Sequence, residues 1–279
     1  MPSARLVTFD IQDRGEVAST ENFVTEVFAL RKSLSERKLW YRGHSDETYK
    51  LIPSVGRSHE YAGKKAHQLD EQQEIWLLHR FRRRAYPHVE RAMTAGEAIF
   101  LARHHGLPTR LLDWTANALF ALYFTCFEKW DRDGEVWAMV LRPDIKVLGA
   151  FALAEAKSES KLFDVRLMLG SHAPHRSDAY ALKLVYPFYN SPRLLAQDGA
   201  FTMHSDPRHS VESLKGKKFT EDNLDVETLY SWRVPARSKT RIVEQLSGLG
   251  ITQRMLFPDL DGVARSLWET EVLWKGARI

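Results

Sequence analysis

The sequence predicts a single α+β domain in which helices flank a mixed or antiparallel sheet. Three observations support this fold class. Apolar residues repeat at helical spacing in some segments and alternate with polar residues, as in strands, in others. The linkers between these segments are short. The chain has 279 residues, of which 44% are hydrophobic, so it has enough apolar material for a sizeable core. We expect the domain to span residues 20–279, after an N-terminal extension of residues 1–19.

The first elements are expected before residue 44. Residues 6–11 alternate in part and indicate a weak strand. Ser19 or Thr20 is expected to cap a helix that ends near Arg37. The apolar stripe of this helix consists of Phe23, Val27, Leu30 and Leu34. Residues 39–41 then favour a strand, which Gly43 is expected to end or bend.

Three helices are expected in the next part of the chain. Residues 69–85 and 96–103 form the first two, and Pro87 ends the first of them. Residues 116–127 are apolar on nearly every side. A helix of this kind belongs in a core, so we expect this one to be buried.

Strands and helices alternate again in the second half. The expected strands are residues 136–141, 181–186 and 229–235. The expected helices are a weak one at 154–169, one at 238–249 and a last one that begins near 258. Residues 205–226 predict a polar surface loop, and 251–257 an extended piece. The buried stripe of the last helix is expected to consist of Leu260, Val263, Leu267 and Trp268.

A polar stretch, residues 104–115, separates two apolar segments. We expect it to be a loop held at both ends by buried structure, which is a common position for a functional site. Its candidate site residues are His105, Thr109, Arg110 and Asp113. A structural turn is the alternative, with Pro108 fixing the bend and Thr115 capping the next helix.

Arg42 is a second candidate, because it stands near the expected end of a strand and beside a glycine. Gly43 has no side chain, so a ligand can approach the backbone while the guanidinium reaches it. The alternative is an arginine paired with a carboxylate of the fold. A third candidate group consists of Asn190, Arg193 and Gln197, whose spacing places them on one face of a short helix. This group is either the wall of a site or a capping network.

The charge of the chain admits an anionic partner without requiring one. The net charge is +4 and the isoelectric point is about 9.1. The densest positive segment is residues 79–84. We interpret it as a solvated helix face rather than a nucleic-acid contact, because no stacking aromatic residues are interleaved at regular spacing. His172 and His175 flank a proline and have no evident third ligand, so we expect no metal site there.

Cysteine usage and the start of the chain bear on its compartment. Cys126 has no partner in the sequence, and its expected role is that of a small buried residue. This composition suits a reducing compartment. The chain opens with no secretory leader and has no apolar run long enough to span a bilayer. We therefore expect a cytoplasmic protein with no membrane association.

The sequence resembles the FRG domain family in four blocks. The first is Tyr41-Arg42-Gly43, which matches the signature that gives the family its name. The others are residues 104–115, 190–201 and 257–262. This resemblance implies a bacterial or phage-type protein, with roles related to defence or toxins and with an antitoxin as one expected partner.

The order of these parts is also similar to that of ADP-ribosyltransferase-like enzymes, which implies NAD as a cofactor and a protein as one kind of acceptor. The cofactor-binding residues are then Tyr41, Arg42, Gly43, Thr109, Arg110 and Arg193. Arg42 would bind the pyrophosphate, and Tyr41 or Trp114 would stack on nicotinamide.

The catalytic residues that the similarity to ADP-ribosyltransferases implies are His105, Asp113 and Gln197. Cleavage of the nicotinamide–ribose bond passes through an oxocarbenium-like state, which a carboxylate stabilises. Most such enzymes use a late glutamate, where this sequence has Gln197. An amide forms hydrogen bonds but carries no charge, so Asp113 is the alternative source of the charge.

Two other functions remain open. One is a nucleic-acid-binding or regulatory module without catalysis, which would use Arg42, Arg110 and the arginines of residues 80–84. The other is a metal-assisted hydrolase or nuclease with His104, His105 and Asp113. We rank it third, because adjacent histidines on a strand point in opposite directions.

Overall fold

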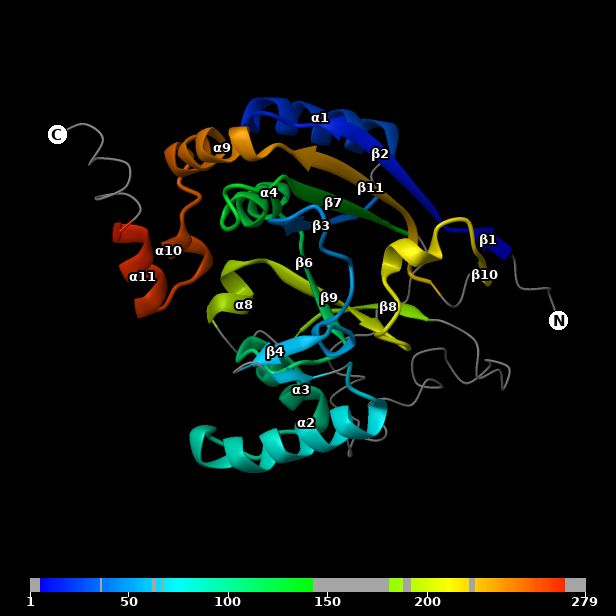
Figure 1. Ribbon diagram of the computed structural model, residues 1–279, viewed down its shortest axis with the longest axis vertical. Helices are drawn as coiled ribbons and strands as arrows, with labels where there is room; N and C mark the ends of the chain where they lie inside the picture. Colours follow the sequence, from blue (N-terminus) through cyan, green and yellow to red (C-terminus); the bar gives the residue numbers. More distant parts are fainter. Residues whose placement is uncertain are drawn as a thin grey trace.

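A seven-stranded sheet runs through the middle of the molecule, as the computed structural model shows (Figure 1). The structure describes residues 6–35, 37–61, 64–66, 68–142, 181–187, 192–220 and 224–268. The strands, in their order across the sheet, are β2 (Asp10–Glu16), β11 (Val226–Val234), β7 (Gly134–Leu141), β3 (Leu39–His44), β6 (Leu111–Thr115), β9 (Gly199–His204) and β8 (Leu182–Val185). Only β2 and β11 are parallel among the described pairs of this sheet; the others are antiparallel. The predicted α+β class with a mixed sheet is confirmed.

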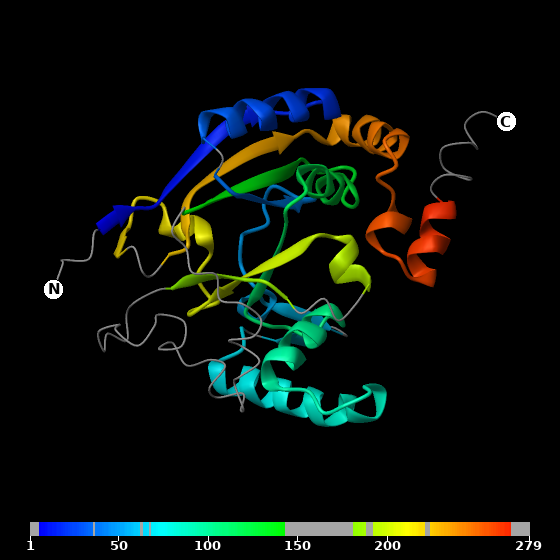
Figure 2. The ribbon, with the colours of Figure 1, turned by 180° about the vertical axis from the view of Figure 1, so that it is seen from behind.

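Two groups of helices cover the two ends of this sheet (Figures 1 and 2). The first group is α1 (Thr20–Ser33), α4 (Ala118–Cys126) and α9 (Ala236–Gly248). Their apolar side chains form one core with β3, β7 and β11. The second group is α2 (Glu71–Ala85) and α3 (Ala95–His104), which form another core with β6, β8 and β9. A third core, on β3, β6 and β7, includes Leu51, Val211 and Leu214.

The remaining elements are short. They are β1 (Leu6–Thr8), β10 (Lys218–Thr220), β4 (His59–Tyr61), β5 (Lys64–Ala66), α8 (Pro192–Ala196), α10 (Gln253–Leu256), α11 (Leu260–Leu267) and the single turns η1 (Ser54–Gly56), η2 (Tyr86–His88) and η3 (Val211–Leu214). Strand β1 pairs with β10, and β4 pairs with β5. No helix of the described ranges is long and apolar enough to cross a membrane.

Helix caps explain where several helices begin. The Ser19 hydroxyl accepts the amide of Asn22 at the start of α1, as predicted. Asp70 and Thr94 form capping boxes at the starts of α2 and α3. The cap predicted for the buried helix was wrong: Asn117, not Thr115, accepts the amides of the first turn of α4.

The helices predicted at 69–85, 96–103, 116–127 and 238–249 are confirmed with shifts of a few residues. So are the strands at 136–141, 181–186 and 229–235. The predicted strand at 6–11 is divided between β1 and β2. Because β2 pairs with β11, residues 10–16 of the predicted N-terminal extension are part of the main sheet. Residues 154–169, His172, His175 and Asn190 lie outside the described residues.

Several local predictions were wrong. Residues 104–115 are not a loop throughout, because residues 111–115 form the central strand β6; the polar Asp113 obscured its alternation. Residues 205–226 hold η3 and β10, and two buried apolar residues of η3 pack on the sheet. Residues 253–256 are helical rather than extended.

The predicted buried stripe of the last helix was also wrong, because Leu260 is 86% exposed and Leu267 and Trp268 are exposed too. The buried residues of α11 are Gly262 and Ser266. A Cβ atom at Gly262 would lie 1.8 Å from the carbonyl oxygen of Phe257. Helix α11 therefore packs through its small residues. The spacing of its apolar residues alone predicted the wrong face of the helix as the buried one.

Candidate functional site

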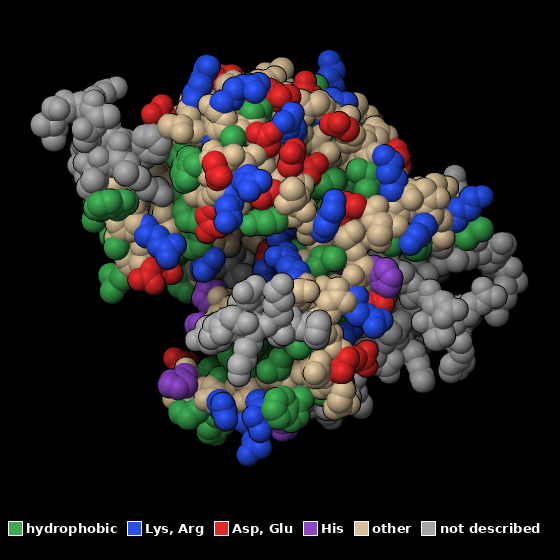
Figure 3. All heavy atoms as spheres, viewed as in Figure 1, with side chains coloured by type: hydrophobic (Ala, Val, Ile, Leu, Met, Phe, Trp, Pro, Cys, Tyr) green, Lys and Arg blue, Asp and Glu red, His purple; other side chains and the backbone are tan. Residues whose placement is uncertain are grey.

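The sheet opens between its central strands β3 and β6. Strand β3 pairs with β7 from Leu39 to His44, and β6 pairs with β9 along its whole length. Within the described residues, β3 and β6 share the single pair Tyr41–Thr115. Figure 3 shows Lys and Arg side chains in the hollow between the upper and lower parts of the molecule. Polar side chains from both sides gather at this opening.

The signature Tyr41-Arg42-Gly43 serves three different purposes, because successive residues of a strand point to opposite faces. Tyr41 is fully buried in the core that contains α1, α4 and α9. Arg42 points to the other face of the strand. Gly43 continues the strand instead of ending it, and a Cβ atom there would lie 2.1 Å from the carbonyl oxygen of Ala121 in α4. The close approach that this glycine permits is therefore to a helix of the fold.

Arg42 is held in place by two hydrogen bonds. Its Nε donates to Nε2 of His44 at 3.0 Å, and its Nη1 donates to the carbonyl oxygen of Asp113 at 2.7 Å. Because arginine only donates, Nε2 of His44 must be an acceptor, and this imidazole is neutral. Burial, followed by the charges of Arg42 and Arg57, lowers the pKa of His44 well below its ordinary value. His44 therefore orients Arg42 without competing with it for charge.

Asp113 is the carboxylate at this opening. Nε of Arg103 donates to its two oxygens at 3.1 and 3.2 Å, and Nη2 of Arg103 forms an ion pair with Oδ2. Nη1 of Arg42 lies 3.6 Å from Oδ2. Partial burial would raise the pKa of Asp113, but the charges and hydrogen bonds of these arginines outweigh it and lower the pKa to about 2. Asp113 is therefore ionised at neutral pH and already paired.

Four guanidinium groups share the electrostatic field of this one carboxylate: Arg42, Arg57, Arg103 and Arg193, which we call the arginine cluster. Burial and the charges of Arg57 and Arg103 lower the pKa of Arg42 to about 10, although Asp113 opposes this shift. Burial also lowers the pKa values of Arg57 and Arg193. At neutral pH the four arginines stay protonated, so the cluster has an excess of positive charge.

Neighbouring groups fix the other members of the cluster. Nε of Arg57 donates to the carbonyl oxygen of Ile52 at 2.8 Å. Nη1 of Arg103 donates to the hydroxyl of Ser54 at 3.0 Å. The guanidinium of Arg193 lies over the ring of Phe257, 4.2 Å from its centroid.

The two adjacent histidines lie in different environments. His104 is the last residue of α3 and is half-buried, whereas His105 is exposed. Burial, then the charges of His105 and Arg193, lowers the pKa of His104. The charge of Arg193 therefore acts on His104. The catalytic role predicted for His105 stays a prediction, at an exposed position.

The structure brings together Arg42, Asp113 and Arg193 of the predicted site residues. The others have partners within the fold. Arg110 forms a buried ion pair with Glu74 of α2, and its Nε and Nη2 donate to one carboxylate oxygen at 3.0 and 2.8 Å. The amide of buried Thr109 donates to the hydroxyl of Ser54. The indole of Trp114 is buried and donates to Thr202.

Gln197 is held by its own contacts. Its Nε2 donates to the carbonyl oxygen of Leu256 at 3.0 Å, and its backbone carbonyl accepts the hydroxyl of Thr115 at 2.7 Å. It joins α8 and β6 to α10. Among the described residues, no three His, Cys, Asp or Glu side chains gather as metal ligands, so His104, His105 and Asp113 do not form a metal site.

Comparison with protein families gives a match for part of the chain. Residues 37–134 match the FRG domain. The matched segment runs from the residues before β3 to the start of β7 and contains the arginines of the cluster except Arg193, together with Asp113. Searches among curated proteins and among solved structures gave no match. The FRG domain resemblance in residues 41–43 and 104–115 is thus supported.

Sequence reasoning missed His44, Ser54, Arg57 and Arg103 as residues of this opening. One signal was present for His44, which lies two residues after Arg42 and therefore shares its face of the strand. Arg103 gave no such signal, because its partner Asp113 lies ten positions away on another element. Only the packing of α3 on β6 brings the side chains of Arg103 and Asp113 together.

Replacing Asp113 with Asn should lower the free energy of unfolding by about 1 kcal/mol at pH 7, after allowance for solvent screening of the half-exposed carboxylate. The folded-state pKa of about 2 lies below the ordinary 3.8. The stabilisation by this carboxylate is therefore present above pH 4 and lost as the pH falls toward 2. Urea unfolding of both proteins between pH 2.5 and 7 measures this.

The matched control is Asp131→Asn, whose carboxylate is 82% exposed and lies 3.8 Å from Arg132. This change should leave stability unaltered within about 0.5 kcal/mol. Equal stability of the Asp113→Asn variant and the wild type at pH 7 would refute the role of Asp113 as the counter-charge of the cluster.

Proposed function

We propose that the arginine cluster binds the phosphate groups of a nucleotide, with NAD as the candidate ligand. The observation that carries this proposal is the presence of four guanidinium groups around one carboxylate. Partly buried cations that depress one another's pKa values are stabilised by an added anion. Arginine is also the side chain that best matches the planar geometry of two phosphate oxygens.

The bonds of Arg42 support this role. A guanidinium has five N–H donors. Nε is used on His44 and Nη1 on Asp113, so the bonds to other described residues leave Nη2 as a donor for a ligand. The two bonds also restrict the side chain to one rotamer, which reduces the entropy lost when a phosphate binds.

Tyr49 favours a nucleotide over a free phosphate ion. Its ring is 42% exposed and lies edge-on to His44, with 6.2 Å between ring centroids. An exposed aromatic ring beside a guanidinium cluster can stack on a base or on nicotinamide while the arginines bind the phosphates.

ADP-ribosyl transfer is the finer form of this proposal. The carboxylate offered to an oxocarbenium-like state is Asp113, which Arg103 and Arg42 already neutralise in part. The amide of Gln197 donates to a backbone carbonyl. These contacts support nucleotide binding more strongly than transfer, so the two are tested separately.

The test is calorimetric titration with NAD, ADP, pyrophosphate and adenosine. We expect NAD and ADP to bind, pyrophosphate to bind more weakly, and adenosine to give no heat. Arg42→Gln should weaken NAD binding by about 10- to 100-fold, the loss expected for charge-assisted hydrogen bonds. Tyr49→Ala should weaken the binding of NAD but not the binding of pyrophosphate. The control is Arg132→Gln, at an exposed arginine outside the cluster.

A folded wild-type protein that binds neither NAD nor pyrophosphate would contradict the proposal. Equal losses in Arg42→Gln and Arg132→Gln would contradict it as well. Transfer is tested by the release of nicotinamide from bound NAD. Chromatography measures this release for the wild type and for Asp113→Asn. Binding of NAD without release of nicotinamide would mean that the protein is a nucleotide-binding module without transferase activity.

A further inference from the structure

The outward face of α2 is an exposed, strongly basic surface. No acidic residue occurs between Glu74 and Glu90. The segment between them carries Arg80, Arg82, Arg83 and Arg84, together with His79 and His88. Within the described ranges, no acidic side chain forms an ion pair with Arg80, Arg83 or Arg84. Arg80, Arg83 and Arg84 therefore carry positive charge that no acidic side chain of the described residues neutralises by an ion pair.

Exposed aromatic residues stand at both ends of the basic segment. Trp76 is 50% exposed and Tyr86 is 64% exposed. The guanidinium of Arg80 lies 3.8 Å from the centroid of the Trp76 ring, on its face. The sequence alone indicated a merely solvated face because no aromatic residues were interleaved at regular spacing. The structure shows instead that aromatic residues bracket the arginines.

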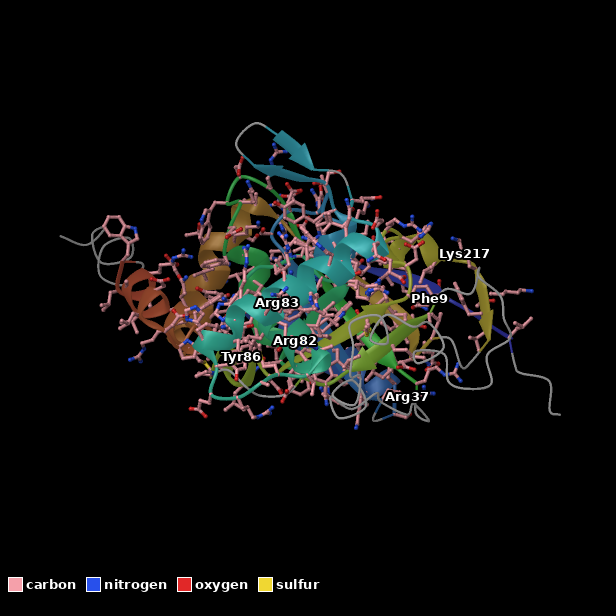
Figure 4. The ribbon with its side chains drawn as sticks, turned by 90° about the horizontal axis from the view of Figure 1, so that it is seen from below. Phe9, Arg37, Arg82, Arg83, Tyr86 and Lys217 are labelled. Atoms are coloured by element: carbon pink, nitrogen blue, oxygen red, sulfur yellow. The ribbon has the colours of Figure 1, made fainter. Side chains whose placement is uncertain are left out.

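Helical geometry places these side chains in one row. Trp76, Arg80 and Arg83 follow one another at spacings of four and three, and Tyr86 comes three residues later. At 1.5 Å per residue, the row is about 15 Å long. The opposite face of α2 holds Leu78 against the α3 core and Glu74 against Arg110. The row therefore lies on the exposed side of α2; Figure 4 labels two of its members, Arg83 and Tyr86.

We infer that this row of Trp76, Arg80, Arg83 and Tyr86 binds single-stranded nucleic acid. The arginines would contact successive phosphates, and the two aromatic rings would stack on unpaired bases. A duplex hides the faces of its bases in the stack, so it can use only the charges. This site is separate from the arginine cluster, because its residues all lie on α2 and its terminal turn.

The experiment measures binding of fluorescent 12-nucleotide oligo(dT) and oligo(U), and of a 12-base-pair DNA duplex, by anisotropy at graded salt. The main variant is Arg80→Gln/Arg83→Gln/Arg84→Gln, which keeps good helix formers in α2. The matched control is Lys215→Gln/Lys217→Gln/Lys218→Gln. These three lysines are also exposed, and Figure 4 shows Lys217 beside Phe9 and away from Arg83 and Tyr86.

The wild type should bind one or both single strands more tightly than the duplex, and the tighter of the two shows whether RNA or DNA is the ligand. The arginine variant should weaken this binding more than 10-fold and reduce the slope of log K against log salt by about 2. Trp76→Ala should weaken it by about 5- to 100-fold at unchanged slope. The lysine control should bind as the wild type does.

Three results would overturn the inference. The first is that the wild type binds neither single strand in 50 mM salt, and the second is that the arginine and lysine variants lose the same amount of affinity. The third is that Trp76→Ala keeps its affinity for the single strands while the wild type binds the duplex as tightly as the single strands. Circular dichroism of each variant checks that α2 is intact. Because NAD binding is tested by calorimetry with Arg42→Gln and strand binding by anisotropy with the α2 variants, a failure of either proposal is distinguishable from a failure of the other.

Discussion

Replacing Arg110 with Met should lower the free energy of unfolding by about 3–5 kcal/mol, the range for a buried charge left without its partner. Arg110 is 1% exposed and Glu74 is 3% exposed. Oε1 of Glu74 also accepts the backbone amide of Arg110, at 2.9 Å. The variant keeps the apolar volume but leaves the Glu74 carboxylate in a place that water does not reach. Chemical denaturation at pH 7 measures the loss.

The loss should depend on pH. Burial raises the pKa of Glu74, and the charge of Arg110 opposes this shift. Without Arg110 the folded-state pKa rises further, so the folded state binds a proton more readily than the unfolded state does. Stability of Arg110→Met should therefore increase as the pH falls from 8 to 5.

A double variant provides the control. Glu74→Gln/Arg110→Met removes both charges and keeps an acceptor for the amide, so it should recover most of the lost stability. If Arg110→Met were as stable as the wild type and bound NAD more weakly, Arg110 would be a ligand-binding residue, as first predicted from the sequence.

Replacing Gly43 with Ala should cost about 3 kcal/mol of folding stability, at the upper end of the range for overpacked cores. The new Cβ atom would lie 2.1 Å from the carbonyl oxygen of Ala121 and 2.7 Å from the backbone nitrogen of Thr125. Both atoms belong to the backbone of α4, which cannot turn aside as a side chain can. The helix must move off the sheet, and thermal unfolding should show a large drop in Tm.

Gly248→Ala is the matched control, because nothing lies within 4 Å of a Cβ atom at this helical position. It should leave the stability unchanged or raise it by up to about 1 kcal/mol. A stable Gly43→Ala variant that no longer binds NAD would show that the glycine faces a ligand rather than α4.

The helices of this fold were predictable because their signals are local. Phe23, Val27 and Leu30 recur at helical spacing, and all three are buried in α1. The apolar segment that became α4 needed no partner to be recognised as buried. The order of the strands gave no such signal. Strand β3 lies between β7 and β6, which come later in the chain, and only long-range packing decides this arrangement.

The site was predictable in part for the same reason. Arg42 stood out because it is a charged residue near the end of a predicted strand and beside a glycine, and Asp113 because it lies in the polar stretch 104–115 between two apolar segments. Arg110 stood out equally, yet it pairs with Glu74, and nothing near it in the sequence distinguishes a structural ion pair from a ligand contact. Arg57 and Arg103 were missed, since their membership of the cluster depends on where η1 and α3 pack.

The single pair between β3 and β6 has a consequence for what a ligand does to the protein. Arg42 lies on β3, which packs against α4. Arg103 lies on α3, which packs against the part of the sheet that contains β6. An anion held by both would add a second bridge to the one that Asp113 already makes between them. The free energy of its binding is then coupled to the association of the two sides, so such a ligand would stabilise the folded protein.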